Sequence, residues 1–350
     1  MVVPVSRREY LVALGAAGTV GIAGCYKAVI RPSLIEQWTF EEGPAIRSPP
    51  VVADETVYIG TDVGYVFAVD AASGEQQWIS QMGSPVSRLR SPAVADGIVY
   101  LGSTNRNLYA LDAESGEQKW TFEADEGVYS PTVVDGTVYA ASADHNLYAI
   151  DASSGEQQWT FEAGDAVITP AIADGIVYVG SVDHNLYAID ATSGHQQWIF
   201  ETDDTVYSPS VANETVYIGS SDNTLYAVDA TSGDQQWAFE ADDSVTSPTV
   251  ANETVYIGCS DHNIYGVDAR SGERQWTFKT ADVVSSQPVV SDGTAYVGSW
   301  DATVYAINAA SGDQQWAFRT GDRVVASPAV VDGTVYVGST DGILYALSGE

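Results

Sequence analysis

The sequence predicts an all-β fold, an eight-bladed β-propeller of four-stranded antiparallel blades, and three observations lead to it. A tryptophan recurs at intervals of 39 to 42 residues, at Trp38, Trp78, Trp120, Trp159, Trp198, Trp237, Trp276 and Trp316. A proline recurs in step with it, from Pro50 to Pro328. The first repeat begins with only a fourth strand around Trp38 and the last ends after three strands. The N-terminal strand is therefore expected to complete the last blade and close the ring.

Each repeat carries four short segments typical of β-strands. In one repeat they are residues 208–212, 215–220, 224–229 and 235–239, rich in Val, Ile, Tyr and Thr and bounded by turn residues. Four short strands in about 40 residues are typical of a propeller blade. A superhelical stack of strands is the competing architecture, but its ends would need caps. The complementary ends favour a closed ring, which removes exposed sheet edges.

A motif with the pattern Ala-x-Asp-x-x-Ser/Thr-Gly-x-x-x-Trp links the third and fourth strands, for instance over residues 68–78. Its Asp can accept backbone N–H groups in an Asx-type turn, and its Gly permits a tight reversal. The Trp is large and flat, so we expect it to lie between neighbouring blades with its ring N–H on a carbonyl oxygen. Asn308 replaces the Asp in one repeat, and Trp38 supplies the tryptophan that the last repeat lacks.

This repeated motif resembles the tryptophan-docking motif of the quinoprotein (PQQ-like) family of eight-bladed propellers, and the resemblance covers residues 38–350. The resemblance implies one of two functions. One branch of the family consists of dehydrogenases that bind pyrroloquinoline quinone (PQQ) and calcium. The other consists of cofactor-free propellers, among them the lipoprotein of the bacterial outer-membrane assembly machine, which is a protein-binding scaffold. The family's alcohol dehydrogenases carry a vicinal cysteine pair, which this sequence lacks, so no cofactor is expected.

The charge of the chain restricts its partners. Among 350 residues, 47 are acidic and 14 basic, which gives a formal net charge of −33. Such a body repels phosphate backbones and anionic membrane surfaces, so we expect no nucleic-acid partner. The chain is 45% apolar, which is not the composition of a disordered acidic protein. An acidic, lysine-poor surface resembles that of a halophilic archaeal protein, because concentrated salt screens the self-repulsion.

Residues 1–24 are interpreted as a twin-arginine export signal that ends in a lipobox. Arg7 and Arg8 precede a short apolar run, and small residues stand before Cys25, the expected lipidation site. Residues 25–33 would form a short tether, and residues 34–350 the propeller. The body is thus expected outside the cytoplasm, anchored to the outer face of the cell membrane through Cys25. An uncleaved N-terminal anchor is the alternative.

Candidate reactive groups give little support for catalysis. Three histidines, His145, His184 and His262, follow an Asp in equivalent turns of three blades, too far apart around a ring to share a metal. Tolerance of left-handed backbone explains them better. Cys259 is interpreted as a small packed side chain. Acidic loops such as residues 201–204 are expected on one face of the ring. They are interpreted either as a calcium-binding surface or as a solvated acidic surface, and no metal site is assigned.

Residues that break the repeat are the candidate contacts with a partner. The residue two places before the repeat proline varies most, and the longest insertion, residues 81–89, brings in Met82, Arg88 and Arg90. If the first strand lines the channel, such residues surround one mouth. The candidates are Arg47, Arg88, Arg90, Tyr129, Tyr207, Trp300 and Arg323. Alternatively, the arginines only offset local acidic repulsion.

The sequence thus predicts a lipid-anchored, non-catalytic scaffold that binds a protein of the cell envelope or membrane. The alternative is a PQQ-dependent oxidoreductase on the outer face of the membrane.

Overall fold

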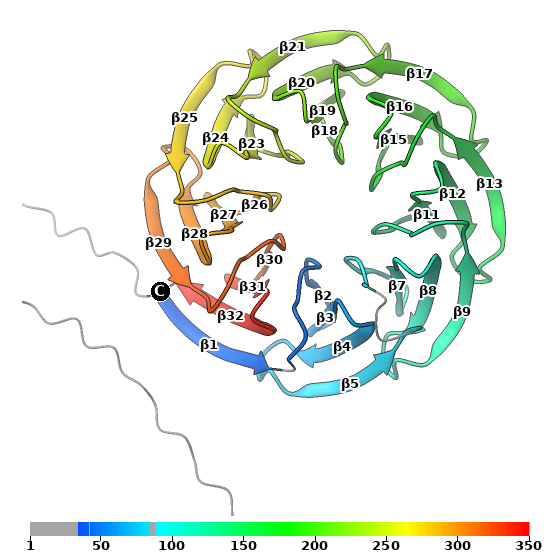
Figure 1. Ribbon diagram of the computed structural model, residues 1–350, viewed down its shortest axis with the longest axis vertical. Coiled ribbons are helices and arrows are strands. Elements are labelled where there is room, and N and C mark those ends of the chain that lie inside the picture. The colour runs from blue at the N-terminus through cyan, green and yellow to red at the C-terminus, as the bar shows by residue number, and fades with distance from the viewer. Residues whose placement is uncertain (1–33, 42, 84–87, 350) are drawn as a thin grey trace, which may run out of the picture. The chain divides into compact units, whose positions relative to one another are not determined.

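The computed structural model describes residues 34–41, 43–83 and 88–349, and these form a closed ring of eight antiparallel four-stranded sheets (Figure 1). The prediction of an all-β, eight-bladed propeller is confirmed. The described residues contain no helix that is long and apolar enough to cross a membrane. Arg7, Arg8 and Cys25, and with them the signal and the tether, lie outside the described residues.

The first strand of each blade is short and lies nearest the ring axis (Figure 1). These strands are β2 (Val51–Ala53), β6 (Ala93–Ala95), β10 (Thr132–Val134), β14 (Ala171–Ala173), β18 (Ser210–Ala212), β22 (Thr249–Ala251), β26 (Val289–Ser291) and β30 (Ala329–Val331). The second strands are mostly buried. They are β3 (Thr56–Gly60), β7 (Ile98–Gly102), β11 (Thr137–Ala141), β15 (Ile176–Gly180), β19 (Thr215–Gly219), β23 (Thr254–Gly258), β27 (Thr294–Ser299) and β31 (Thr334–Gly338).

The third strands are also buried, and they carry an aromatic-aliphatic pattern. They are β4 (Tyr65–Asp70), β8 (Asn107–Asp112), β12 (Asn146–Asp151), β16 (Asn185–Asp190), β20 (Thr224–Asp229), β24 (Asn263–Asp268), β28 (Thr303–Asn308) and β32 (Ile343–Gly349). The fourth strands form the outer rim and alternate between exposed and packed residues. They are β5 (Gln76–Gln81), β9 (Gln118–Glu123), β13 (Gln157–Glu162), β17 (Gln196–Glu201), β21 (Gln235–Glu240), β25 (Arg274–Lys279), β29 (Gln314–Arg319) and β1 (Leu34–Glu41).

The ring closes through β1, as the sequence predicts. This N-terminal strand pairs antiparallel with β32, with Leu34 opposite Gly349 and Trp38 opposite Ala346, and completes the sheet β1-β32-β31-β30. We number the blades from β2–β5 as blade 1 to β30–β32 with β1 as blade 8. Every sheet therefore has four strands, and no blade lacks its outer strand.

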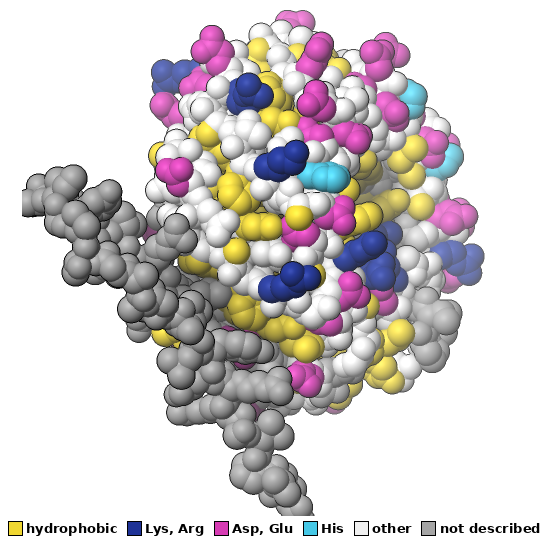
Figure 2. Space-filling model, turned by 60° about the vertical axis from the view of Figure 1, so that its left-hand side comes forward, with side chains coloured by type: hydrophobic (Ala, Val, Ile, Leu, Met, Phe, Trp, Pro, Cys, Tyr) yellow, Lys and Arg dark blue, Asp and Glu magenta, His cyan; other side chains and the backbone are white. Residues whose placement is uncertain are grey.

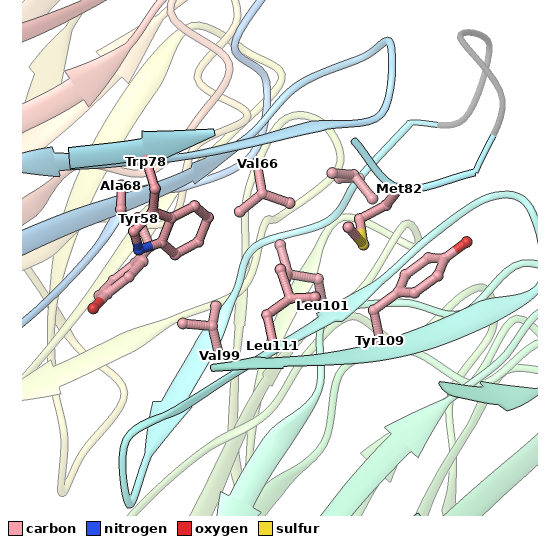
Figure 3. Packing of buried hydrophobic residues seen from close by; sticks show 10 residues of the cluster. Tyr58, Val66, Ala68, Trp78, Met82, Val99, Leu101, Tyr109 and Leu111 are labelled. Carbon is pink, nitrogen blue, oxygen red and sulfur yellow. The ribbon is translucent and has the colours of Figure 1, made fainter. Parts of the chain in front are cut away.

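The hydrophobic core is divided among the contacts between neighbouring blades. In one cluster, Tyr58, Val66 and Trp78 of blade 1 pack against Leu101 and Tyr109 of blade 2 (Figure 3). Burial of each such side chain contributes about 1.5–3 kcal/mol. Since blade follows blade through contacts of this kind, the ring acts as a stiff support for its loops.

The two faces of the ring carry different connections. The loop face carries the second-to-third-strand turns and the connections between blades, which meet where the amide of Asp203 donates to Asp222. The motif face carries the first-to-second-strand turns and the Asp motifs, which meet where the amide of Ala71 donates to the carbonyl of Glu55. Because β1 begins beside the end of β32, Leu34 lies at the motif face.

Candidate functional site

Each of seven junctions between blades is held by one carbonyl oxygen that accepts two side-chain donors from the preceding blade. At Ala309 these donors are the indole Nε1 of Trp276 at 3.0 Å and the hydroxyl of Tyr256 at 3.3 Å. The other carbonyls belong to Ala71, Ala113, Ala152, Ala191, Ala230 and Ala269. Two lone pairs are thus used at each site.

The Asp motif presents this carbonyl in a fixed turn. Asp70 Oδ1 accepts the hydroxyl of Ser73 at 2.7 Å and the amide of Ser73 at 2.8 Å. These bonds, the hydroxyl first, lower the pKa of Asp70. Gly74 has φ +74°, and a Cβ there would lie 2.7 Å from the ring of Trp38, so only glycine fits against the indole.

The loop face has a second repeated device, in which an Asp ties a turn to the neighbouring connection. Asp183 Oδ2 accepts the hydroxyl of Tyr187 at 2.6 Å and the amide of Gly164 at 2.7 Å. Burial raises the pKa of Asp183, but its hydrogen bonds outweigh burial and the net pKa is lowered. Equivalent aspartates that accept a Tyr hydroxyl are Asp144, Asp222, Asp261, Asp301 and Asp341.

Blades 1 and 2 break this device. Blade 1 has Val63 and Phe67 in place of the Asp and the Tyr. Blade 2 keeps Tyr109, but Asn105 replaces the Asp and donates its amide to the Tyr hydroxyl at 2.7 Å. The repeated carboxylate is therefore absent from its usual position in two adjacent turns of the loop face, and blade 1 carries Asp62 one residue earlier instead.

Arginines gather at the same two blades. Asp62, in the turn of blade 1, pairs through Oδ2 with Arg47 Nε at 2.9 Å and through Oδ1 with Arg88 Nε at 3.2 Å. Arg90 lies over the ring of Tyr129, with its guanidinium carbon 4.7 Å from the ring centre. Burial, and then the charge of Arg88, lower the pKa of Arg90. We call Arg47, Asp62, Arg88, Arg90 and Tyr129 the arginine sector.

The other three predicted contacts lie elsewhere on the loop face. Arg323 lies over the ring of Trp300, at 4.8 Å from its centre, and the indole donates to Ser285 Oγ at 2.7 Å. Tyr207, between blades 4 and 5, shares hydrogen bonds with Ser221 Oγ at 2.9 Å and Ser244 Oγ at 3.4 Å. The seven candidates thus divide into one sector, one pair and one isolated residue.

The structure corrects two assignments made around the mouth. Ser48, Ser286 and Ala326 stand two places before the proline but are buried. These three blades have one extra residue before the first strand. In two of them the hydroxyl of Ser48 or Ser286 donates to the carbonyl of the glycine that ends the second strand. In blade 2 the backbone N–H of Arg90 donates to the equivalent carbonyl instead. Met82 is buried between blades 1 and 2, near Tyr109 (Figure 3), so this residue of the insertion belongs to the core, whereas Arg88 of the same insertion is exposed.

Reactive groups elsewhere serve the fold. His145, His184 and His262 have φ between +73° and +75°, as expected for residues chosen for left-handed backbone. Cys259 is buried, and burial raises the pKa of its thiol to about 12. Among the described residues, no group of three or more His, Cys, Asp or Glu is placed to hold a metal ion.

Figure 2 shows one side of the ring, where acidic side chains outnumber basic ones. Against this background, the sequence reasoning missed Asp62, which joins Arg47 to Arg88. The available signal was the loss of the repeated Asp at Val63 and Asn105, next to the arginines.

Comparisons with known proteins agree with this architecture. No curated protein matches the sequence. By structure, the chain is similar to the computationally designed protein Ika8, with a TM-score of 0.82 and 15% identity, over 89% of this chain and 98% of that one. It is also similar to BamB from Moraxella catarrhalis, with a TM-score of 0.76 and 18% identity, over 90% and 98% of the two chains.

A third similar structure is the quinohemoprotein alcohol dehydrogenase from Comamonas testosteroni, with a TM-score of 0.77 and 16% identity, over 90% of this chain and 76% of that one. At these identities the likeness concerns the fold alone. A family model described as outer membrane protein assembly factor BamB matches residues 27–128, 62–169, 125–207, 165–278 and 260–350. The chain therefore belongs to this family of PQQ-like, eight-bladed propellers.

Proposed function

We propose that this protein is a non-catalytic scaffold that binds another protein of the cell envelope through its loop face. The observation that carries the proposal is the arginine sector, where repeat-breaking residues and basic charge coincide on two adjacent blades. Seven near-identical junctions hold the ring, so they cannot by themselves distinguish a partner. Residues that depart from the repeat are the ones able to provide specificity.

The proposed anchor would keep the ring close to the membrane. If Cys25 carries lipid, the nine-residue step to Leu34 reaches at most about 30 Å when fully extended. Leu34 lies at the motif face. The motif-face end of β1 would then lie within that distance of the anchor. Replacement of Cys25 by Ser should release the protein from cells, and retained membrane association would contradict lipid anchoring.

A pull-down from native membranes tests the scaffold function. The bait is the full chain, and the matched variants are Arg88→Ser with Arg90→Ser against Arg270→Ser. Arg270 is an exposed arginine that pairs with Glu253 on the motif face, so it controls for loss of positive charge. The double variant should lose a membrane protein that the control retains, with circular dichroism unchanged. Equal capture by both would show that the loop face at blades 1 and 2 is not the binding surface.

The quinone-dependent alternative fits the residues poorly. The chain has no vicinal cysteines, and the described carboxylates and histidines offer no grouped metal ligands. Protein purified in concentrated salt and then offered PQQ and calcium is expected to show no quinone absorbance after gel filtration. Stoichiometric quinone would replace the scaffold proposal with an oxidoreductase.

A further inference from the structure

We infer that the arginine sector binds side-chain carboxylates of an acidic peptide segment in the partner protein, an inference that rests on the proposed function and specifies its ligand. Asp62 holds two guanidinium groups through their Nε atoms, one on each of its oxygens. The side chains of Arg47 and Arg88 remain 44% and 39% exposed. Their terminal nitrogens are the donors suited to a planar carboxylate, which arginine binds with two parallel hydrogen bonds.

Charge at the sector is unbalanced in favour of an anion. Arg47 and Arg88 pair with Asp62, Arg90 lies within the range of its charge, and Asp62 is the only described carboxylate that pairs with any of the three. Arg90 also lacks an acceptor, because its Nε is buried and has no hydrogen-bond partner among the described residues. Such a group is costly to bury unless a ligand or neighbour supplies an acceptor.

The surroundings favour a narrow acidic segment over an extended anionic surface. The sector carries three positive charges and one negative charge, so it can neutralise about two carboxylates. Elsewhere the same face carries acids such as Asp203, Asp204, Asp242 and Asp243, which would repel a membrane or a nucleic acid laid across the ring. A peptide that inserts one or two carboxylates avoids that repulsion.

Isothermal titration calorimetry with a capped hexaglutamate peptide tests the inference, and capped hexaglutamine is the neutral comparison. The protein is the full chain in about 1 M salt, where long-range repulsion is screened. Arg88→Gln should weaken hexaglutamate binding by about tenfold, since a charged hydrogen bond contributes about 1.5 kcal/mol or more. Arg270→Gln should leave the affinity for hexaglutamate unchanged. Arg88→Lys keeps the positive charge but not the planar guanidinium, so it should lose part of the affinity.

Three results would overturn the inference: equal binding of the two peptides, equal loss in Arg88→Gln and Arg270→Gln, or binding to phosphatidylglycerol vesicles without binding to the peptide. The two proposals can fail separately. A wild-type chain that captures a membrane protein but does not bind hexaglutamate retains its scaffold function and loses this ligand. A chain that binds hexaglutamate but captures no protein retains the site and loses the scaffold function.

Discussion

The doubly bonded carbonyl at each blade junction predicts a non-additive loss of stability. Tyr256→Phe and Trp276→Phe each remove one hydrogen bond to the Ala309 carbonyl, and each bond contributes about 1 kcal/mol. Either single change leaves the carbonyl with one donor. The double change leaves the buried carbonyl without either donor, and this desolvated carbonyl costs about 1–3 kcal/mol more. The double variant should therefore lose roughly 1 kcal/mol or more beyond the sum of the two single losses.

Urea unfolding at constant salt, followed by far-ultraviolet circular dichroism, measures these free energies. Trp276→Phe also removes ring volume, and Trp316→Phe controls for that term. Trp316 is equally buried and lies 5.8 Å from the Tyr296 ring, but its indole has no hydrogen-bond acceptor among the described residues. Additivity within about 0.3 kcal/mol would refute the shared-carbonyl reasoning, because it would mean that the two donors act independently.

Three further predictions follow from local structure. Glu214 has φ +59° in a turn where five of the eight blades carry Gly, so Glu214→Gly should raise the free energy of unfolding by about 0.5–1 kcal/mol in the same urea assay. The folded pKa of Asp183 is lowered, so its stabilising contribution is present above pH about 4 and lost as pH falls. The pKa of Tyr187 is raised to about 12 by burial and then by its bond to Asp183, so its contribution is lost as pH rises from about 10 to 12. The urea midpoint should fall at both acid and alkaline pH, and Asp183→Asn should reduce the acid loss by the share of this one aspartate, because the equivalent aspartates remain. In a Cys25→Ser chain, Cys259 should react with a thiol reagent only after denaturation, and rapid labelling of the folded protein would contradict its burial.

The fold could be predicted because the repeated residues are required by local features, such as turn conformation and contacts with the neighbouring blade. Gly74 must be glycine, since its φ is positive and an indole covers it. The single strand around Trp38 and the three strands that end near Leu347 could be matched as one blade by sequence alone, and β1 pairs with β32 as expected. The glycine depends on neighbours in adjacent repeats, and the closure depends only on the number of strands at each end, so counting along the chain is sufficient to find both.

The candidate site could be predicted only in part, because contacts across blades decide it. Arg47 and Arg90 are equivalent, because each follows a residue whose backbone N–H bonds the second-to-third-strand turn of the preceding blade. An extra residue before β2 places Arg47 three residues before its proline and Arg90 two before its own, so the sequence hides this equivalence. Tyr207 shares the position of Arg90 but lies at a junction far along the ring. Asp62 escapes a search for basic residues, although it is the group that joins two of them.

The net charge of −33 and the arginine sector act over different distances, which determines how salt affects binding. A carboxylate that approaches the loop face is repelled by each acid about 10 Å away by about 0.4 kcal/mol in water before screening. The Debye length falls from about 10 Å at 0.1 M salt to about 3 Å at 1 M, so that repulsion is largely removed. Paired contacts with Arg88 at hydrogen-bond distance are no longer than the Debye length even at 1 M salt, so they are screened much less. Affinity for hexaglutamate should therefore rise with salt over this range, and a fall would mean that long-range attraction, rather than paired contact, holds the peptide.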